Sequence, residues 1–312
     1  MKLDRYRGSI LGLAAGDALG APVEFKRPGS FKPVSGMTSG GAFGLTAGQW
    51  TDDTSLALCL SESLIETKGF YLVDQLERYV LWYRHGHLSS TGECFDIGNT
   101  TSAALREFER TRNPRCGPTS PSTAGNGSLM RLAPVPLVYA NRFVEAVEKS
   151  GESSRTTHGA IEAVDSCRYM GALITGAVNG RSKADLLSDH YSEDPSYWRD
   201  NPLCEKVAAI AKGSFKEKAP PSIKGGGYVI ECLEAALWAF HNSESFESGC
   251  LLAVNLGDDA DTTGAVYGQL AGAYYGASGI PDTWVNSLAK NDLLESHSQA
   301  LHELAGSFTR EI

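Results

Sequence analysis

The sequence has no closely spaced pair of cysteines. Its seven cysteines are odd in number and scattered over 312 residues without a C-x-x-C motif. A disulfide framework needs paired cysteines, and a structural zinc site needs ligands at short, regular spacing. Both are therefore excluded, and we expect reduced, mostly buried thiols in a cytoplasmic protein.

Long apolar runs are also missing. No uncharged apolar segment approaches the roughly 20 residues that cross a bilayer as a helix. The charged segment Met1–Arg7 leads into a stretch interrupted by Gly12, Gly16 and Asp17, which makes a poor signal peptide. We expect no membrane partner.

Positive charge is in deficit. The chain has 28 Lys and Arg residues against 37 Asp and Glu residues, a formal net charge of −9. This balance argues against a general surface for nucleic acid or anionic membranes. It leaves room for a local basic pocket that binds a phosphorylated small molecule.

Alternating strand patterns are scarce, and helical spacing dominates. Leu56, Leu60 and Leu64, for example, recur every four residues. The sequence therefore predicts an all-α fold. We expect helices near 56–64 and 72–83, and over 9–20, 98–110, 158–177, 202–212 (opened by Asn201-Pro202), 227–241, 245–255, 261–275 and 291–306.

Two of these helical segments are rich in glycine and alanine. Residues 8–20 read GSILGLAAGDALG and residues 264–276 read GAVYGQLAGAYYG. Each glycine costs a helix about 1 kcal/mol relative to alanine. Small residues spaced by four let helix axes approach closely, so we expect both segments to be central, tightly packed helices.

No change of composition marks a linker, and no tandem repeat is present. We therefore expect residues 1–312 to form a single compact domain, and the protein to be a monomer. Two long irregular stretches, 26–50 and 113–128, interrupt the helices. Such loops inside a compact domain are usually functional or disordered, and we favour function because both lead into the motifs described next.

Two acidic clusters stand about 200 residues apart, each at the start of an expected helix. Residues 51–54 read Thr-Asp-Asp-Thr, and residues 258–263 read Asp-Asp-Ala-Asp-Thr-Thr. Carboxylates and hydroxyls without histidine or cysteine are ligands for hard cations such as Mg²⁺ or Mn²⁺. If the clusters meet in the fold, they form one metal site.

Helix capping is the simpler explanation for such clusters, because Asp and Thr at a helix start satisfy free N–H groups. One cap needs one side chain, however, and packed like charges are costly unless a cation neutralises them. Capping and metal binding both stay open on these residues alone. Asp258 lies outside the D-x-D-T spacing and is expected to be a cap or an outer group.

Other motifs carry weaker signals. Asp17 and Glu24 bracket the end of the first small-residue helix, where turn chemistry is the ordinary explanation. Asp96 lies among apolar neighbours, which suits acid/base work but also a cap. Residues 125–131 (GNGSLMR) form a glycine-bracketed turn that can bind phosphate. His158 is a cap by default, and Tyr228 belongs to the core by default unless it stacks on a base.

Together these motifs resemble the ADP-ribosylglycohydrolase family, most of all its bacterial dinitrogenase-reductase-activating glycohydrolase branch. The matching segments run in order through nearly the whole chain: GLAAGDALGAPVEF (12–25), WTDDT (50–54), FDIGNTT (95–101), GNGSLMR (125–131), TH (157–158), GYV (227–229), GDDADTTGAVYGQLAGA (257–273) and GIPDTW (279–284). The paired WTDDT and D-x-D-T segments are the specific ones.

The resemblance implies an all-α, orthogonal multi-helix domain with two divalent cations, Mg²⁺ or Mn²⁺, in a central cleft. The implied metal ligands are Thr51, Asp52, Asp53, Asp259, Asp261 and Thr262. The implied catalytic residues are Glu24 and Asp96. The implied substrate-binding residues are Asn99, Gly125, Asn126, Gly127, Ser128, Met130, His158, Gly227 and Tyr228.

The implied reaction hydrolyses the bond between C1″ of ADP-ribose and an acceptor on a protein or small molecule, arginine in many members, and releases ADP-ribose. Serine, a nucleic-acid base or a small ADP-ribose ester would present the same ADP-ribosyl half, and nucleic acid is expected only as such a modified substrate. Two alternatives stay open: a metal-dependent phosphoesterase or pyrophosphatase, and a non-catalytic relative that binds ADP-ribose.

Overall fold

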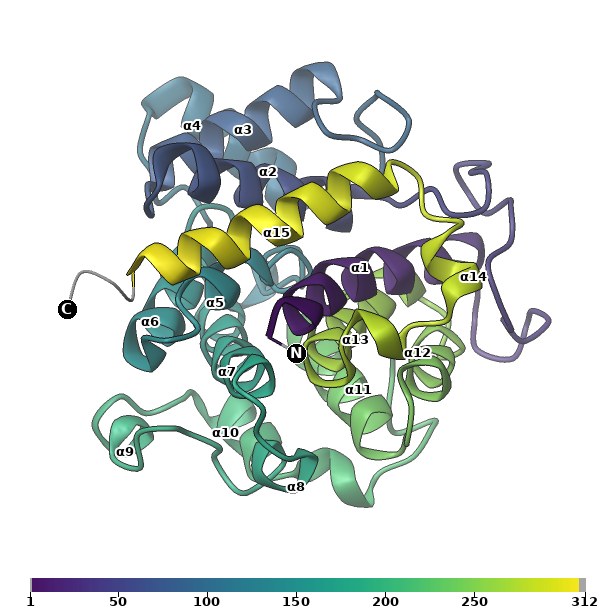
Figure 1. Ribbon diagram of the computed structural model, residues 1–312. Helices are drawn as coiled ribbons and strands as arrows, with labels where there is room; N and C mark the ends of the chain where they lie inside the picture. Colours follow the sequence, from purple (N-terminus) through teal and green to yellow (C-terminus); the bar gives the residue numbers. More distant parts are fainter. Residues whose placement is uncertain (1, 309–312) are drawn as a thin grey trace.

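Two central helices, α1 (Lys2–Gly20) and α13 (Ala260–Tyr275), run antiparallel against each other in the computed structural model, which describes residues 2–308 (Figure 1). Glycines line their contact and face one another in three pairs: Gly8 with Gly272, Gly12 with Gly268, and Gly16 with Gly264. A Cβ added at Gly16 would lie 2.0 Å from the Gly264 carbonyl oxygen. The predicted close packing of the two small-residue helices is confirmed.

Three helices form the part of the molecule at the top of Figure 1, namely α2 (Asp52–Thr67), α3 (Leu72–His85) and α4 (Asn99–Thr111). The long C-terminal helix α15 (Asn291–Phe308) packs against α1, α2 and α5 (Pro134–Val138). It thereby joins this upper part to the central pair.

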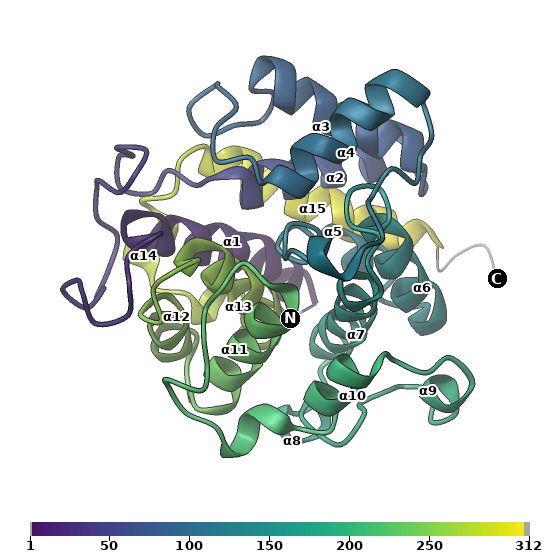
Figure 2. The ribbon, with the colours of Figure 1, turned by 180° about the vertical axis from the view of Figure 1, so that it is seen from behind.

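The remaining helices surround the other sides of α1 and α13, as the reverse view in Figure 2 shows. Helices α7 (Ile161–Val178), α11 (Val229–His241) and α12 (Phe246–Val254) pack on α13, and α6 (Phe143–Ser154) packs on α7. Four short helices complete the set: α8 (Lys183–Leu186), α9 (Tyr197–Asp200), α10 (Glu205–Ala211) and α14 (Asp282–Val285).

The predicted all-α class is confirmed over residues 2–308, which contain fifteen α-helices and no β-strand. The segments 26–50 and 113–128 contain no α-helix, as expected. Their residues take part in two isolated bridges, and the second segment holds a short 3-10 helix (Pro121–Thr123). All seven cysteines are free, and four are buried. The single domain over residues 1–312 stays a prediction.

The helix expected over 202–212 begins later than predicted. Its first residue is Glu205, with Cys204 at the N-cap. Asn201 instead ends the short helix α9, since its backbone N–H donates to the Tyr197 carbonyl oxygen at 2.8 Å. Asn201-Pro202 therefore closes one helix and does not open the next.

Helix α6 had no counterpart among the predicted helices. Its buried face carries small residues, including Ser150 and Gly151, where periodicity arguments look for large apolar ones. The fit is close, because a Cβ on Gly171 of α7 would lie 2.4 Å from Ser150 Oγ.

Within residues 2–308, no helix combines the length and the apolar character needed to span a membrane. The cytoplasmic location stays a prediction.

The glycine contact gives a first testable prediction. A Cβ at position 268 would lie 1.9 Å from the Gly12 carbonyl oxygen, and backbone on both sides leaves little room to relax. We expect Gly268→Ala to lower the free energy of unfolding by at least about 2 kcal/mol, measured by urea denaturation.

Gly306→Ala is the matched control. Gly306 lies in α15, and an added Cβ would meet nothing within 4 Å. This change should raise the free energy of unfolding by about 1 kcal/mol, through helix propensity alone. Equal denaturation midpoints for wild type and Gly268→Ala would contradict the packing argument.

Candidate active site

The two acidic clusters meet in the fold, because the N-termini of α2 and α13 lie side by side. Thr51 Oγ1 lies 3.3 Å from Asp261 Oδ2, and the Thr262 hydroxyl donates to Asp53 Oδ1 at 3.3 Å. Segments about 200 residues apart in sequence thus form one cluster of carboxylates and hydroxyls. This is the juxtaposition on which the metal hypothesis depends.

Asp17, on α1, caps helix α2 from outside that helix. Its Oδ1 accepts from the backbone N–H and hydroxyl of Thr51 at 2.9 and 3.0 Å, and its Oδ2 accepts from those of Thr54 at 3.1 and 2.7 Å. The Thr51 side chain itself makes no capping bond. Asp17 and Glu24 do bracket the end of α1, which lies at Gly20, but turn chemistry does not explain Asp17, because its carboxylate binds the start of α2.

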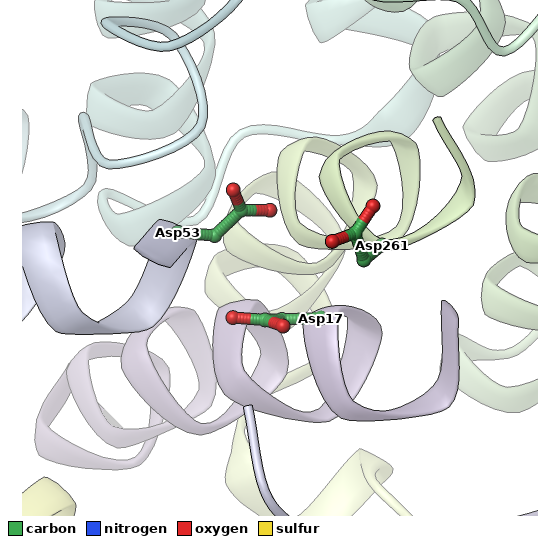
Figure 3. Close-up of side chains that lie close together, drawn as sticks. All are labelled: Asp17, Asp53 and Asp261. Atoms are coloured by element: carbon green, nitrogen blue, oxygen red, sulfur yellow. The ribbon is translucent and has the colours of Figure 1, made fainter. Parts of the chain in front are cut away.

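Figure 3 shows Asp17, Asp53 and Asp261 converging from α1, α2 and α13. One carboxylate oxygen from each lies within 4.8 Å of the others, and all three residues are buried. A second trio, Glu24, Asp96 and Asp261, meets the same distance criterion. Asp261 belongs to both trios and therefore lies between them.

Burial, with repulsion between neighbouring carboxylates, raises the pKa of Glu24, Asp52, Asp53, Asp96 and Asp261. The pKa of Glu24 rises to about 10, first through burial and then through the charges of Asp96 and Asp259. Burial likewise raises the pKa of Asp96 to about 7. The pKa values of Asp53 and Asp261 are raised well above the usual aspartate range for the same reasons.

Three buried carboxylate oxygens have no hydrogen-bond partner among the described residues: Glu24 Oε2, Asp53 Oδ2 and Asp261 Oδ1. A buried carboxylate without a donor is costly. Since these oxygens belong to a cluster of like charges, they fit a hard divalent cation. The acidic cluster can therefore bind metal.

A cleft of about 470 Å³ opens directly onto the cluster. Twelve of the seventeen predicted site residues line it: Glu24, Asp52, Asp96, Asn99, Gly125, Asn126, Gly127, Met130, His158, Gly227, Asp259 and Thr262. Thr51, Asp53 and Asp261 lie buried beneath its floor. One end of the cleft is therefore acidic, and the other is built from glycine turns and the imidazole ring.

The glycine turns at the second end are held together by backbone pairing. Gly125 and Tyr228 form an antiparallel bridge, and the Asn126 N–H donates to the Gly227 carbonyl oxygen at 3.1 Å. The Asn126 side chain donates to Asp259 Oδ2 at 2.8 Å. Asn126 thus links the glycine turn to the acidic cluster.

The His158 ring stands directly beside this turn. A Cβ added at Gly127 would lie 2.9 Å from His158 Cε1, and one at Gly125 would lie 3.4 Å from Nε2. Glycine at both positions leaves the backbone open beside the imidazole. Main chain that lines the cleft next to an imidazole ring suits an anionic group.

A buried arginine is linked to the His158 ring through the Thr157 hydroxyl. Arg131 donates to the Gly127 carbonyl oxygen at 2.8 Å and to Thr157 Oγ1 at 2.7 Å. Thr157 Oγ1 lies 2.8 Å from His158 Nδ1. The Thr157 hydroxyl accepts from Arg131, and we infer that it donates its own proton to Nδ1, so that the neutral ring carries its proton on Nε2, toward the cleft.

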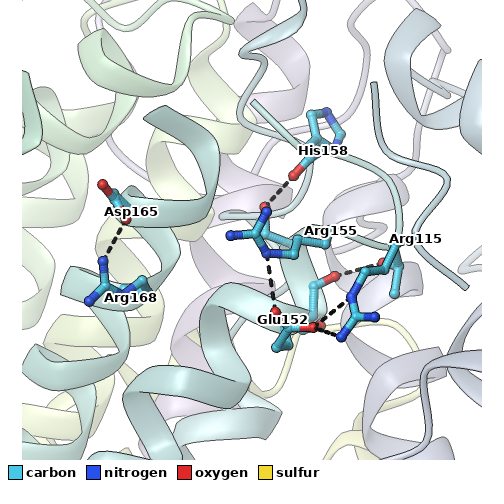
Figure 4. Close-up of polar contacts among 9 residues, drawn as sticks. Arg115, Glu152, Arg155, His158, Asp165 and Arg168 are labelled. Carbon is cyan, nitrogen blue, oxygen red and sulfur yellow. Dashed lines mark hydrogen bonds and ion pairs between the residues drawn. The ribbon is translucent and has the colours of Figure 1, made fainter. Parts of the chain in front are cut away.

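The chain around His158 is fastened to its surroundings, as Figure 4 shows. The Ser154 hydroxyl donates to the His158 carbonyl oxygen at 2.8 Å, and the Gly117 N–H donates to that of Arg155 at 3.1 Å. Ion pairs from Glu152 to Arg115 and Arg155 close the same junction. The loop 113–128 is thereby tied to the end of α6.

Two predicted substrate-binding residues do not line the cleft. Ser128 is buried and shares a hydrogen bond of 2.8 Å with Ser154. The Tyr228 hydroxyl donates to Glu162 at 2.6 Å and accepts from Lys206 at 2.8 Å. Their roles toward a substrate stay predictions.

Several residues of the site went unrecognised in the sequence. Phe25 and four neighbours of Asn99 (Ile97, Gly98, Thr100 and Thr101) line the cleft, whereas Asp17 and Arg131 act from behind it. The available signal was a single charge in an apolar setting: Asp17 interrupts a Gly/Ala helix, and Arg131 follows Leu-Met. Only the fold shows which partners those charges reach.

A model of the family described as ADP-ribosylglycohydrolase matches residues 1–311. The chain belongs to the ADP-ribosylglycohydrolase family. This confirms the resemblance seen in the motifs, and with it the prediction that the protein is a hydrolase.

Relatives in this family are similar over almost the whole chain. The ADP-ribosylarginine hydrolase Tri1 of Serratia proteamaculans (strain 568) is 41% identical over 303 residues, which cover 97% of this chain and 80% of Tri1. The ADP-ribosyl-dinitrogen reductase glycohydrolase of Rhodospirillum rubrum is 30% identical over 311 residues, which cover 97% of each chain. A solved structure, described as an ADP-ribosylglycohydrolase-related protein complex, matches with a TM-score of 0.85 at 41% identity, over 97% of this chain and 99% of that one.

The acidic cluster predicts how stability depends on metal and pH. Its carboxyls have higher pKa values in the fold than in the unfolded chain, so the metal-free fold binds extra protons and loses stability as the pH rises above about 4. We expect saturating Mg²⁺ or Mn²⁺ to raise the melting temperature by roughly 5 °C or more. The gain should be larger at about pH 8 than at about pH 5.5, since ligands must be deprotonated.

Thermal melts with chelator or added cation check this expectation. Asp261→Asn should lose most of the cation-dependent gain because Asp261 belongs to both carboxylate trios. Identical melting temperatures with and without cation, at both pH values, would rule out a metal site here.

The neutral state of His158 is a further prediction. Burial, assisted by the Arg131 charge, lowers the pKa of His158 to about 3. Between that value and the usual one near 6.5, the unfolded chain takes up a proton that the fold does not, so this group lowers stability as the pH falls. Nitrogen-15 NMR should show one tautomer, protonated at Nε2, from about pH 8 to about pH 5.

Position 157 offers a matched pair of variants for this measurement. Thr157→Val keeps the shape but removes the hydroxyl, and should give a mixture of tautomers. Thr157→Ser keeps the hydroxyl and should preserve the single tautomer. A proton on Nδ1 in the wild type would overturn the assignment.

Proposed function

We propose that the protein is a metal-dependent hydrolase that cleaves the C1″ glycosidic bond of ADP-ribosyl-arginine on proteins and releases ADP-ribose. One observation carries the proposal: a single cleft has a cluster of partnerless buried carboxylates at one end and glycine turns with a neutral imidazole at the other. A ribose with a reactive C1″ suits the first end. A pyrophosphate suits the second.

The names of the relatives support arginine as the acceptor. Tri1 is an ADP-ribosylarginine hydrolase, and the match to this chain at about two-fifths identity extends across both ends of the cleft. Serine, base and ester acceptors are the alternatives that the experiment below separates.

We assign two divalent cations, Mg²⁺ or Mn²⁺, to the acidic end. Their ligands would be Thr51, Asp52, Asp53, Asp259, Asp261 and Thr262. Bound there, such ions supply orientation of the ribose hydroxyls and activation of a water molecule. Asp17 would keep Thr51 in position through the hydrogen bonds that fix the start of α2.

Glu24 and Asp96 face the cleft next to Asp261 and are assigned to proton transfer. An ADP-ribosylated guanidinium already carries a positive charge, so the C1″–N bond breaks with its electron pair going to nitrogen and a neutral guanidine leaves. The attacking water loses its proton to a carboxylate, which then returns it to the guanidine. One base is therefore sufficient, and a separate acid is not required as it is for most glycosides.

The glycine turn and His158 would hold the pyrophosphate. The Nε2–H of a neutral imidazole would donate to a phosphate oxygen without forming an ion pair. No ion pair then has to break when the product leaves. Asn99 and the first turn of α4 line the wall between the two ends, where backbone N–H groups remain free at a helix start.

Release of free ADP-ribose from an arginine-ADP-ribosylated protein, with Mn²⁺ and with chelator, tests the proposal. Asp261→Asn should lower kcat roughly 10²- to 10³-fold, the loss that follows removal of one key electrostatic group. Asp258→Asn is the matched control, because Asp258 is exposed and its backbone conformation (φ 53°) tolerates asparagine.

Other products point to other functions. AMP with ribose phosphate would indicate a pyrophosphatase. Cleavage of serine-linked or ester-linked ADP-ribose without the arginine-linked form would change the acceptor. Wild-type turnover by Asp261→Asn would reject the site assignment.

A further inference from the structure

Three neighbouring phenylalanines beside the cleft form what we call the aromatic rim: Phe25 and Phe43, which are exposed, and Phe95, which is half-buried. The ring centroids of Phe25 and Phe43 lie 6.3 Å apart, and those of Phe43 and Phe95 lie 5.3 Å apart. Phe25 is 65% exposed and Phe43 is 36% exposed. Adjacent exposed rings of this kind on a protein surface often mark a binding site.

The rim lies at the acidic end of the cleft. Phe25 directly follows Glu24 and lines the cleft, and Phe95 directly precedes Asp96. The glycine turn and His158 form the opposite end. A group attached to C1″ next to Glu24 and Asp96 would therefore lie close to the rim.

The backbone holds the rim rings in place. The Phe25 N–H donates to the Asp258 carbonyl oxygen at 2.6 Å, and the Asp258 N–H donates to that of Lys26 at 2.8 Å. Phe25 itself has a φ of 61°, a conformation that is uncommon for a bulky residue. Such strain persists only where the surroundings impose it, and it concentrates at functional sites.

The segment that carries Phe43 is also anchored. A Cβ added at Gly41 would lie 2.6 Å from the Ala21 carbonyl oxygen, so this loop passes directly over the residues before Glu24. Gly40 and Leu45 pair across the turn that contains Phe43, with hydrogen bonds of 2.8 and 2.9 Å. The loop 26–50 thus presents Phe43 from a fixed turn.

We propose that the aromatic rim binds the guanidinium group and aliphatic stem of the ADP-ribosylated arginine and so selects arginine as the acceptor. The inference rests on the proposed function. Phenyl faces attract a cation, and they also cover the methylene groups of an arginine side chain. The carboxylates of Glu24 and Asp96 add negative charge on the cleft side of the same path.

A neutral acceptor gains far less from this surface. A serine or acyl group offers no cation to the ring faces and has a shorter apolar stem. The rim therefore distinguishes acceptors that share the same ADP-ribosyl half, which the rest of the cleft treats alike.

Phe43 is the position at which to test the proposal, because it belongs to the rim but does not line the cleft. Phe43→Leu keeps apolar bulk and removes the π face. We expect kcat/KM for an arginine-ADP-ribosylated peptide to fall roughly 3- to 30-fold, with inhibition by free ADP-ribose unchanged. Phe43→Tyr keeps the ring and should retain wild-type kcat/KM.

Tyr71→Ala is the control for loss of an exposed aromatic ring elsewhere. Tyr71 is 59% exposed and precedes α3, and its loss should leave both measurements unchanged. Thermal melts of all variants establish that they are folded.

The outcomes separate the two proposals. Wild-type enzyme that releases no ADP-ribose from the arginine-linked peptide defeats the proposed function. Wild-type enzyme that does so, with Phe43→Leu equally active, defeats the rim proposal alone. A Phe43→Leu change that weakens free ADP-ribose binding as much as peptide turnover also defeats it, since the ring would then serve the ADP-ribosyl half.

Discussion

The contact between the glycines of α1 and α13 is the constraint on which the rest of the structure depends. It places backbone against backbone along most of both helices, and this fixes the position of α1 along α13. Only at that separation does Asp17 of α1 reach the start of α2 while Asp261 of α13 lies beside Glu24. The acidic cluster is thus a product of helix packing as much as of its own residues.

Electrostatics gives the cluster its chemistry. Carboxylates from four segments are buried within a few ångströms of one another, and their pKa values rise because burial and mutual repulsion disfavour the charged form. Stability alone would not select such an arrangement. The opposite end of the cleft presents no charge. Arg131 is buried behind His158 and contacts it through the Thr157 hydroxyl, so that an uncharged imidazole ring faces the cleft.

Local patterns in the sequence predicted most of the helices, both acidic clusters and the glycine turns, because spacing and residue type carry that information. What they could not predict were the partners of single buried charges. Asp17 looks like a helix end until α2 is placed beside it, and Arg131 looks like one residue of a motif until Thr157 lies within reach. Helix α6 was not predicted because its buried face consists largely of small residues. Asn201-Pro202 did not open the next helix as predicted, because a short helix ends there.

The cap that Asp17 places on α2 has a consequence for how the site acquires its ligands. A helix start held by its own N-cap can fray with that helix, but this one is fastened to a second helix through four hydrogen bonds. The side chains of the first turn of α2 are therefore ordered by the fold before any cation arrives. Ions can then bind to and dissociate from a preformed site without unfolding the protein. Small metal-binding domains differ, because they fold only while metal is bound.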